Sequence, residues 1–206
     1  MLNTQISRFP TCGGREMSGN HLIVGLSTRP QIGSKTSAVI QNLIHSVEDS
    51  FSLNSDCFEL SELSSSLRAA SFRTELGGLA KDALDKIERS DLLIVGLSVK
   101  TPTGYPALLR YLFEMADPAA LRGKPTLLVE THSNNPTQQC TELEIDMLMQ
   151  SFGLNVVSNI RISSSELLRD VIPDVGRTQE MIATLYRSGL NPVSAAPDNI
   201  KQLHIH

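Results

Sequence analysis

Five short apolar segments alternate with amphipathic helical patterns along this chain, and no other feature restricts its fold as much. The segments at residues 21–26 and 91–99 are almost continuous apolar runs, which is typical of strands buried on both faces of a parallel sheet. Parallel strands need crossover connections, which are right-handed and place helices over both faces of the sheet. The sequence therefore predicts one α/β domain with a five-stranded parallel sheet.

The same patterns give the expected limits of each element. Strands are predicted at residues 21–26, 52–59, 91–99, 124–130 and 154–162, and helices at residues 34–45, 79–89, 105–115, 138–152 and 178–188. The polar stretch at residues 61–78 is predicted to cross the surface. The domain is expected to span residues 21–190, between a flexible arm at residues 1–20 and a tail at residues 191–206.

Composition and charge argue against several classes of protein. Of the 206 residues, 40% are hydrophobic and 19% are charged, which is globular composition and unlike that of a disordered chain or a coiled coil. A net charge of −4 without a basic cluster argues against binding to nucleic acid, and the apolar runs are shorter than the roughly 20 residues that cross a membrane. Cys12, Cys57 and Cys140 are widely spaced, which predicts reduced thiols in the cytoplasm and no cysteine-based metal site.

Ligands of a doubly wound sheet bind at the carboxyl ends of its strands, where the strand order reverses. In the order 2-1-3-4-5 this point lies between the first and third strands, which directs attention to residues 25–36, 98–105 and 131–137. The first of these loops reads GLSTRPQIGSKT and combines hydroxyl groups, two cations and the start of a helix. Those groups can form a phosphate site; the alternative is that the hydroxyl groups only cap the helix. The loop matches neither the P-loop pattern nor G-x-G-x-x-G, which argues against a P-loop NTPase and a dinucleotide-binding site.

Three short motifs stand in the same order as in one known family. The first is G-x-S at Gly25 followed by SKTS at residues 34–37, where that family holds a phosphate. The second is YPALLR from Tyr105, and the third is ALRGKP from Ala120, which leads into the fourth strand. Over roughly residues 22–162 the chain thereby resembles the NADPH-dependent FMN reductases, particularly the small reductase components of two-component alkanesulfonate monooxygenases.

This resemblance implies a flavodoxin-like three-layer αβα sandwich with the strand order 2-1-3-4-5. It implies that FMN binds with its phosphate on the first loop and its ring against the second and third loops, and that NADPH or NADH passes a hydride to flavin N5. No side chain then acts as a catalytic acid or base, and the reduced flavin is supplied to a monooxygenase or another acceptor. Homodimers or homotetramers are expected, with Tyr105 at the seam between subunits. The residues expected at the cofactor are Ser27, Arg29, Ser34, Lys35, Thr36, Ser98, Val99, Lys100, Thr101, Gly104, Thr131, His132 and Ser133.

The second and third loops depart from the family pattern. SVKT at residues 98–101 replaces the family's T-P-x-Y, and ETHSN at residues 130–134 replaces a glycine-rich loop that lets backbone amides approach the flavin. Lys100 is either a ligand-binding cation or a solvated lysine, and His132 is either a donor to the flavin carbonyls or a polar loop residue. Two other functions therefore stay open: a flavin-binding electron carrier, and a catalytically degenerate family member that acts as a binding or assembly protein.

Overall fold

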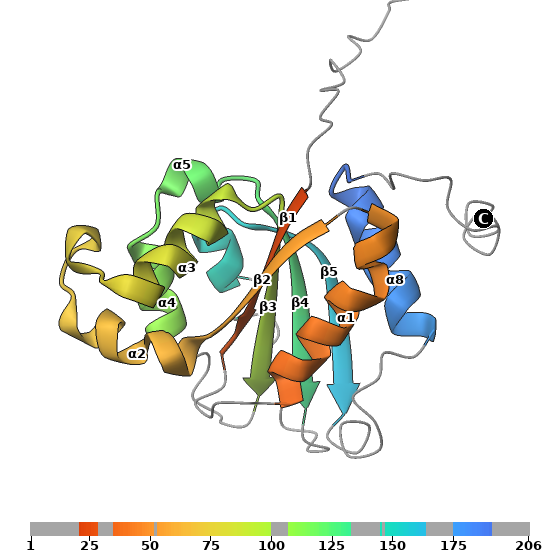
Figure 1. Cartoon of the computed structure of the whole chain (residues 1–206), viewed down its shortest axis with the longest axis horizontal. Coiled ribbons are helices and arrows are strands. Elements are labelled where there is room, and N and C mark those ends of the chain that lie inside the picture. Colours follow the sequence, from red (N-terminus) through yellow and green to blue (C-terminus); the bar gives the residue numbers. More distant parts are fainter. Residues whose placement is uncertain are drawn as a thin grey trace, which may run out of the picture.

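The sheet has five parallel strands in the order β2-β1-β3-β4-β5. The structure is a computed structural model, and it describes residues 21–28, 35–51, 53–99, 107–132, 145, 147–163 and 175–190. The strands are β1 (His21–Ser27), β2 (Leu53–Glu59), β3 (Leu92–Val99), β4 (Pro125–His132) and β5 (Asn155–Ser163). Strand order and direction confirm the predicted fold, and the arrows in Figure 1 show β3, β4 and β5 ending at one edge of the sheet.

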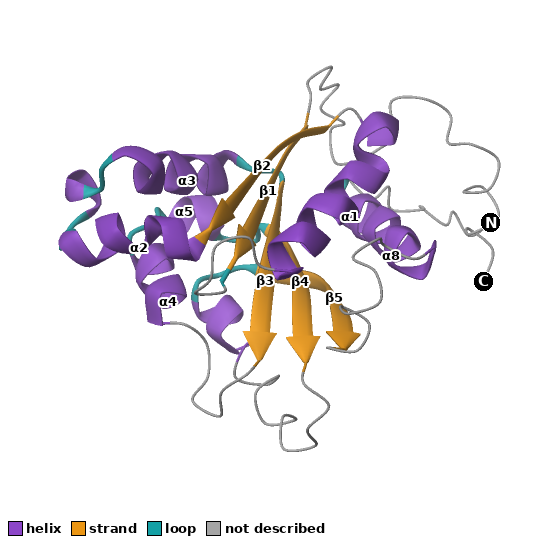
Figure 2. Ribbon diagram, turned by 60° about the horizontal axis from the view of Figure 1, so that its bottom comes forward, coloured by secondary structure: helices purple, strands orange, loops and turns teal. Residues whose placement is uncertain are grey.

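Helices cover both faces of this sheet (Figures 1 and 2). On one face lie α1 (Lys35–Phe51) and α8 (Val175–Arg187). On the other face lie α2 (Leu60–Ala69), α3 (Gly78–Arg89), α4 (Ala107–Glu114), α5 (Pro118–Leu121) and the helical residues 147–151, with the short 3₁₀ helix Arg73–Glu75 between α2 and α3. The molecule is therefore the three-layer sandwich that right-handed crossovers require.

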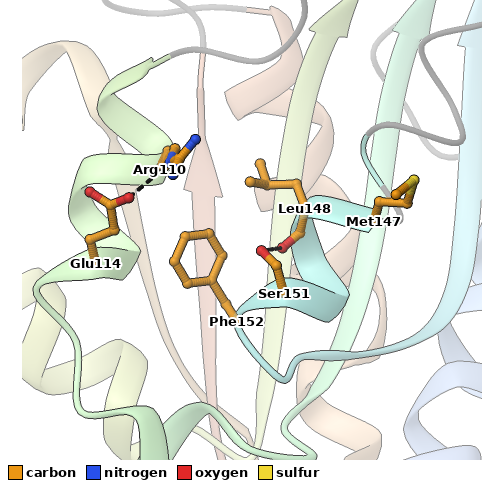
Figure 3. Close-up of a pocket in the computed structure, with 6 residues that line it drawn as sticks. All are labelled: Arg110, Glu114, Met147, Leu148, Ser151 and Phe152. Carbon is orange, nitrogen blue, oxygen red and sulfur yellow. Dashed lines mark hydrogen bonds and ion pairs between the residues drawn. The ribbon is translucent and has the colours of Figure 1, made fainter.

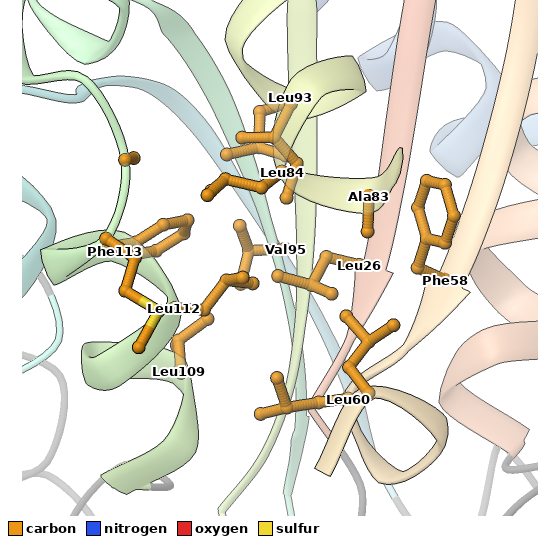
Figure 4. Packing of buried hydrophobic residues seen from close by; sticks show 14 of the residues in the cluster. Leu26, Phe58, Leu60, Ala83, Leu84, Leu93, Val95, Leu109, Leu112 and Phe113 are labelled. Atoms are coloured by element: carbon orange, nitrogen blue, oxygen red, sulfur yellow. The ribbon is translucent and has the colours of Figure 1, made fainter. Parts of the chain in front are cut away.

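Two hydrophobic cores result, one on each face of the sheet. In β3 the side chains of Leu93 and Val95 join the core under α2 to α5, whereas those of Leu92 and Ile94 join the core under α1 and α8. Figure 4 shows the first core, in which Leu109, on α4, lies close to the strands. Alternation of side chains between two buried faces explains why this strand is apolar at consecutive positions.

One helix was not predicted, and some limits differ. In the polar stretch at residues 61–78, α2 occupies the first half. The buried face of α2 consists of Leu60, Leu63 and Leu67, at helical spacing. Helix α1 continues to Phe51, six residues beyond the expected end at His45, because Val47 and Phe51 are buried against the sheet. The domain limits at residues 20 and 191 stay predictions.

Candidate functional site

Helix α1 packs unusually close to the sheet because two glycines face it. A Cβ atom on Gly25 of β1 would lie 2.5 Å from Cγ2 of Ile40, and one on Gly96 of β3 would lie 2.6 Å from Cγ2 of Thr36 and 2.7 Å from Cδ1 of Ile40. Such distances leave no room for a side chain, so glycine at both positions permits the approach. The first turn of α1 thereby lies against Gly96, in the carboxyl-terminal half of β3.

Thr36, the second residue of α1, carries the clearest sign of a ligand site. Its side chain is 0% exposed, and its hydroxyl has no hydrogen-bond partner within the described part of the chain. A buried hydroxyl without a partner costs about 1–3 kcal/mol, and the first N–H groups of a helix also lack partners within the helix. A phosphate would accept hydrogen bonds from both groups and would be favoured by the positive end of the helix dipole.

Ser27 is the last residue of β1 and Thr28 follows it, and both are buried. The amide and the hydroxyl of Thr28 both donate to the carbonyl of Gly96, each over 2.9 Å. Thr28 was not among the predicted residues, although it belongs to the same hydroxyl-rich stretch of the sequence. Lys35 begins α1 and is exposed, so its cationic side chain is accessible at the helix N-terminus.

The second and third predicted loops begin side by side. Ser98 of β3 pairs with Thr131 of β4, and Val99 pairs with His132. The Thr131 side chain is 3% exposed, and its hydroxyl donates to the Leu97 carbonyl over 3.2 Å. Of Ser98, Val99 and His132 only the backbone is described. The sheet therefore brings these backbone positions to the edge at which α1 begins.

The remaining predicted residues lie outside the described part of the chain. They are Arg29, Ser34, Lys100, Thr101, Gly104, Tyr105 and Ser133. The structure thus joins Ser27, Thr36, Ser98 and Thr131 at one edge of the sheet, and a direct contact of any of them with a cofactor stays a prediction.

A polar cluster just inside this edge was not predicted from the sequence. Glu130 of β4 is 1% exposed and accepts a hydrogen bond from Nδ2 of Asn159 over 2.7 Å. Its other carboxyl oxygen lies 3.9 Å from Nε of Arg161, which pairs with it across β4 and β5. A buried carboxylate requires such partners because desolvation of the charge is costly. The order of apolar and polar residues along β4 and β5 does not indicate that these polar side chains lie together.

Cys57 of β2 contributes no reactive thiol. Burial, together with the nearby carboxylate of Asp56, raises the pKa of Cys57 to about 11. The thiol is therefore protonated at neutral pH, and the thiolate that nucleophilic or redox chemistry needs is scarce. Within the described ranges, no three His, Cys, Asp or Glu side chains are grouped closely enough to hold a metal, and none of the helices is sufficiently long and apolar to span a bilayer.

A groove of about 460 Å³ lies on the opposite face of the sheet from α1, between α4 and residues 147–152 (Figure 3). Its lining residues are Arg110, Glu114, Met147, Leu148, Ser151 and Phe152. Arg110 and Glu114 form an ion pair of 2.8 Å along α4, and the Met147 side chain is 61% exposed. The groove is separate from the first turn of α1, so it is not part of the phosphate site.

The sequence of this chain is similar to those of known FMN reductases. No family model matches the chain. An FMN reductase (NADPH) of Pseudomonas aeruginosa is 32% identical over 115 residues, which are 56% of this chain and 61% of that protein. An NADH-dependent FMN reductase SfnF of Pseudomonas fluorescens is 35% identical over 109 residues, which are 53% of this chain and 58% of that protein. The match therefore spans about three fifths of the length of these relatives.

Solved structures extend the comparison to most of the chain. An apo NADH:FMN oxidoreductase superposes with a TM-score of 0.66 at 19% identity and covers 86% of this chain and 92% of its own. Oxidised flavodoxin 1 from Bacillus cereus superposes with a TM-score of 0.50 at 10% identity and covers 81% of this chain and 98% of its own. The chain has a flavodoxin-like fold, and its predicted resemblance to FMN reductases is confirmed over somewhat more than half of its length.

Proposed function

We propose that this chain is an NAD(P)H-dependent FMN reductase that binds the FMN phosphate at the N-terminus of α1. The observation that carries the proposal is the fully buried Thr36 hydroxyl, which lacks a partner within the described residues and lies in the first turn of a 17-residue helix. The similarity to two curated FMN reductases supports the same ligand. A phosphate at this turn would accept hydrogen bonds from both the Thr36 hydroxyl and the first N–H groups of the helix.

The protein supplies position rather than acid–base chemistry in this proposal. FMN, when bound, supplies the redox chemistry by taking up a hydride from the nicotinamide at N5. Ser27, Lys35 and Thr36 would hold the phosphate, and the backbone at Ser98 and Thr131, paired across β3 and β4, would support the ring. The protonated thiol of Cys57 takes no part.

Purified protein mixed with FMN and either NADPH or NADH tests this function. Loss of nicotinamide absorbance with free FMN as a substrate is expected. Flavin that stays bound through purification without turnover would instead favour an electron carrier, and no flavin binding at micromolar concentration would favour a binding or assembly protein. Both nucleotides belong in the assay because the two relatives are named for different ones.

Replacement of Thr36 by Val tests the phosphate site itself. Valine keeps the methyl group that faces Gly96 but removes the buried hydroxyl. We expect FMN affinity to fall about tenfold, while the free energy of unfolding of the flavin-free protein stays equal or rises by about 1 kcal/mol, because an unpaired buried polar group has been removed. Unchanged FMN affinity would remove the main support for the site.

The proposal has three further parts. They are the supply of reduced flavin to a flavin-dependent monooxygenase, assembly into a homodimer or homotetramer, and a cytoplasmic location. The groove beside α4 supports the assembly, because the exposed Met147 and the ion pair between Arg110 and Glu114 offer both apolar and self-complementary charged surface to a second copy. Light scattering of the wild type and of Met147→Glu tests the assembly, and a smaller mass for the variant is expected.

The free cysteine Cys57 supports the cytoplasmic location, because the cytoplasm keeps thiols reduced.

A further inference from the structure

A row of paired residues crosses three strands next to the first turn of α1. Ser27 of β1 pairs with Glu59 of β2 on one side and with Gly96 of β3 on the other. The Thr36 side chain packs on Gly96, with its Cγ2 atom 2.6 Å from where a Cβ atom would be. Neighbouring strands are about 5 Å apart, so the backbone of Glu59 lies roughly 10 Å from that of Gly96.

The Glu59 side chain lies on the face of the sheet that α1 covers. Successive side chains of a strand point to opposite faces. Phe58 belongs to the core under α2 to α5, whereas Cys57 packs with the core under α1 and α8, so the next residue, Glu59, faces α1. The side chain is also largely buried, because Glu59 is only 9% exposed. A buried carboxylate therefore shares one face of the sheet with the buried Thr36 hydroxyl.

We propose that Glu59 limits the affinity of the α1 N-terminus for phosphate and thereby keeps FMN exchangeable. The inference rests on the proposed function, because it concerns the same site. A carboxylate and a phosphate carry charges of the same sign and repel each other, and salt screens buried charges less than exposed ones. A carboxylate is also an anion that the positive end of a helix attracts, so it competes with a phosphate for that position. A reductase that supplies reduced flavin has to release it, and a lower affinity serves that release.

Glu59→Gln tests the proposal, because the amide keeps the shape of the carboxylate and removes its charge. The matched control is Glu62→Gln, since Glu62 is exposed in the first turn of α2 and its replacement changes the net charge by the same amount. Glu59→Met, also uncharged and of similar length, serves as a second variant if the glutamine variant does not fold. Flavin fluorescence measures the dissociation constants for FMN and for riboflavin, which has no phosphate, and rapid dilution measures the rate of FMN release.

Glu59→Gln is expected to bind FMN about tenfold more tightly, with slower release, and to bind riboflavin like the wild type. The same result is expected for Glu59→Met, whereas Glu62→Gln should bind both flavins like the wild type. A gain in affinity separates the charge from a structural role, because damage to the fold weakens binding. Unchanged or weaker FMN binding in the folded Glu59 variants, an equal gain for riboflavin, or an equal gain in Glu62→Gln would each overturn the proposal.

A set of proteins that all bind no flavin would instead overturn the proposed function, and inorganic phosphate then decides the role of Glu59. At equal ionic strength, phosphate is expected to raise the Tm of Glu59→Gln by about 1–3 °C more than that of the wild type or of Glu62→Gln. The reason is that phosphate at the start of α1 no longer meets a carboxylate. Equal rises in the three proteins would show that Glu59 does not act on this site.

Discussion

At the scale of single residues, Gly25 sets how closely α1 can approach the sheet. A methyl group at this position would lie 2.5 Å from Cγ2 of Ile40 and 3.0 Å from Sγ of Cys57. Gly25→Ala is therefore expected to displace α1, to lower the free energy of unfolding by about 1–3 kcal/mol, and to weaken FMN binding because the helix N-terminus moves with it. Urea denaturation and a flavin titration measure the two effects.

Gly77→Ser is the control for added bulk, because a Cβ atom at Gly77 has no neighbour within 4 Å. Gly77 is also the N-cap of α3, where serine is favourable, so this variant should keep or slightly raise the free energy of unfolding. A Gly25→Ala protein as stable as the Gly77→Ser protein would mean that α1 does not depend on the glycine surface.

The predictable and the unpredictable parts of the site also divide at this scale. That Ser27 and Thr36 lie at the edge of the sheet where α1 begins could be predicted, because they follow a buried strand and precede a helix in the sequence. The hydrogen bond of the Thr28 hydroxyl to the Gly96 carbonyl could not be predicted, because the two residues are 68 positions apart. That contact exists only because β1 and β3 are neighbours, and the residue types alone do not say which side chain faces the neighbouring strand.

At the scale of elements, Glu88 connects three helical segments on one face of the sheet. Its carboxylate, on α3, accepts hydrogen bonds from the Arg73 guanidinium of the 3₁₀ helix and from the Asp117 amide at the start of α5. Burial raises the pKa of Glu88, but the bonds from Arg73 and Asp117 outweigh it and hold this pKa below its ordinary value of 4.5. The pKa in the folded state thus lies below that in the unfolded state, so the stabilisation is present at neutral pH and is lost as the pH falls through the folded-state pKa.

Glu88→Gln is expected to lower the free energy of unfolding by roughly 1–3 kcal/mol near neutral pH. The difference from the wild type should shrink as the pH falls through the folded-state pKa of Glu88, because the wild-type carboxylate is then protonated. Glu114→Gln is the control, because the exposed ion pair of Glu114 with Arg110 contributes little. Urea denaturation at neutral pH and at a series of increasingly acidic pH values measures this, and a difference independent of pH would contradict the ionic role of Glu88.

Most elements were predictable from their apolar periodicity, and α2 shows where this method fails. Four of its ten residues are serines, and its N-cap residue, Glu59, makes no side-chain capping bond. Local preference for a helix is therefore weak. The helix forms because Leu60, Leu63 and Leu67 enter the core shared with α3 and α4, and burial of this kind overrides local preference.

At the scale of the whole molecule, charged side chains protect the two edge strands, β2 and β5. On β2, Asp56 binds Lys86 over 3.0 Å, and the Lys86 ammonium lies 5.6 Å from the centre of the Phe58 ring. On β5, the Arg187 guanidinium donates to the Val157 carbonyl over 3.2 Å. These contacts tie α3 and α8 to the edges and discourage pairing with other chains.

Because the site joins α1 to β1 and β3, binding there should stabilise the entire domain. A ligand that binds only the folded state adds about 2.7 kcal/mol at a hundredfold excess over its Kd. For a domain of this size each kcal/mol raises Tm by about 2–4 °C, so saturating FMN is expected to raise Tm by about 5–10 °C. The rise should continue with the logarithm of FMN concentration, as mass action requires.

Riboflavin at the same concentrations should raise Tm less than FMN, because it lacks the phosphate that the α1 N-terminus and the buried Thr36 hydroxyl would bind. In Thr36→Val the Tm shifts caused by FMN and by riboflavin should become more alike, since the variant loses a contact that only FMN would make. Equal shifts for FMN and riboflavin in the wild type would show that the flavin ring alone determines affinity. That result would leave the buried hydroxyl at the start of α1 without a function, although the fold pays about 1–3 kcal/mol to keep it there.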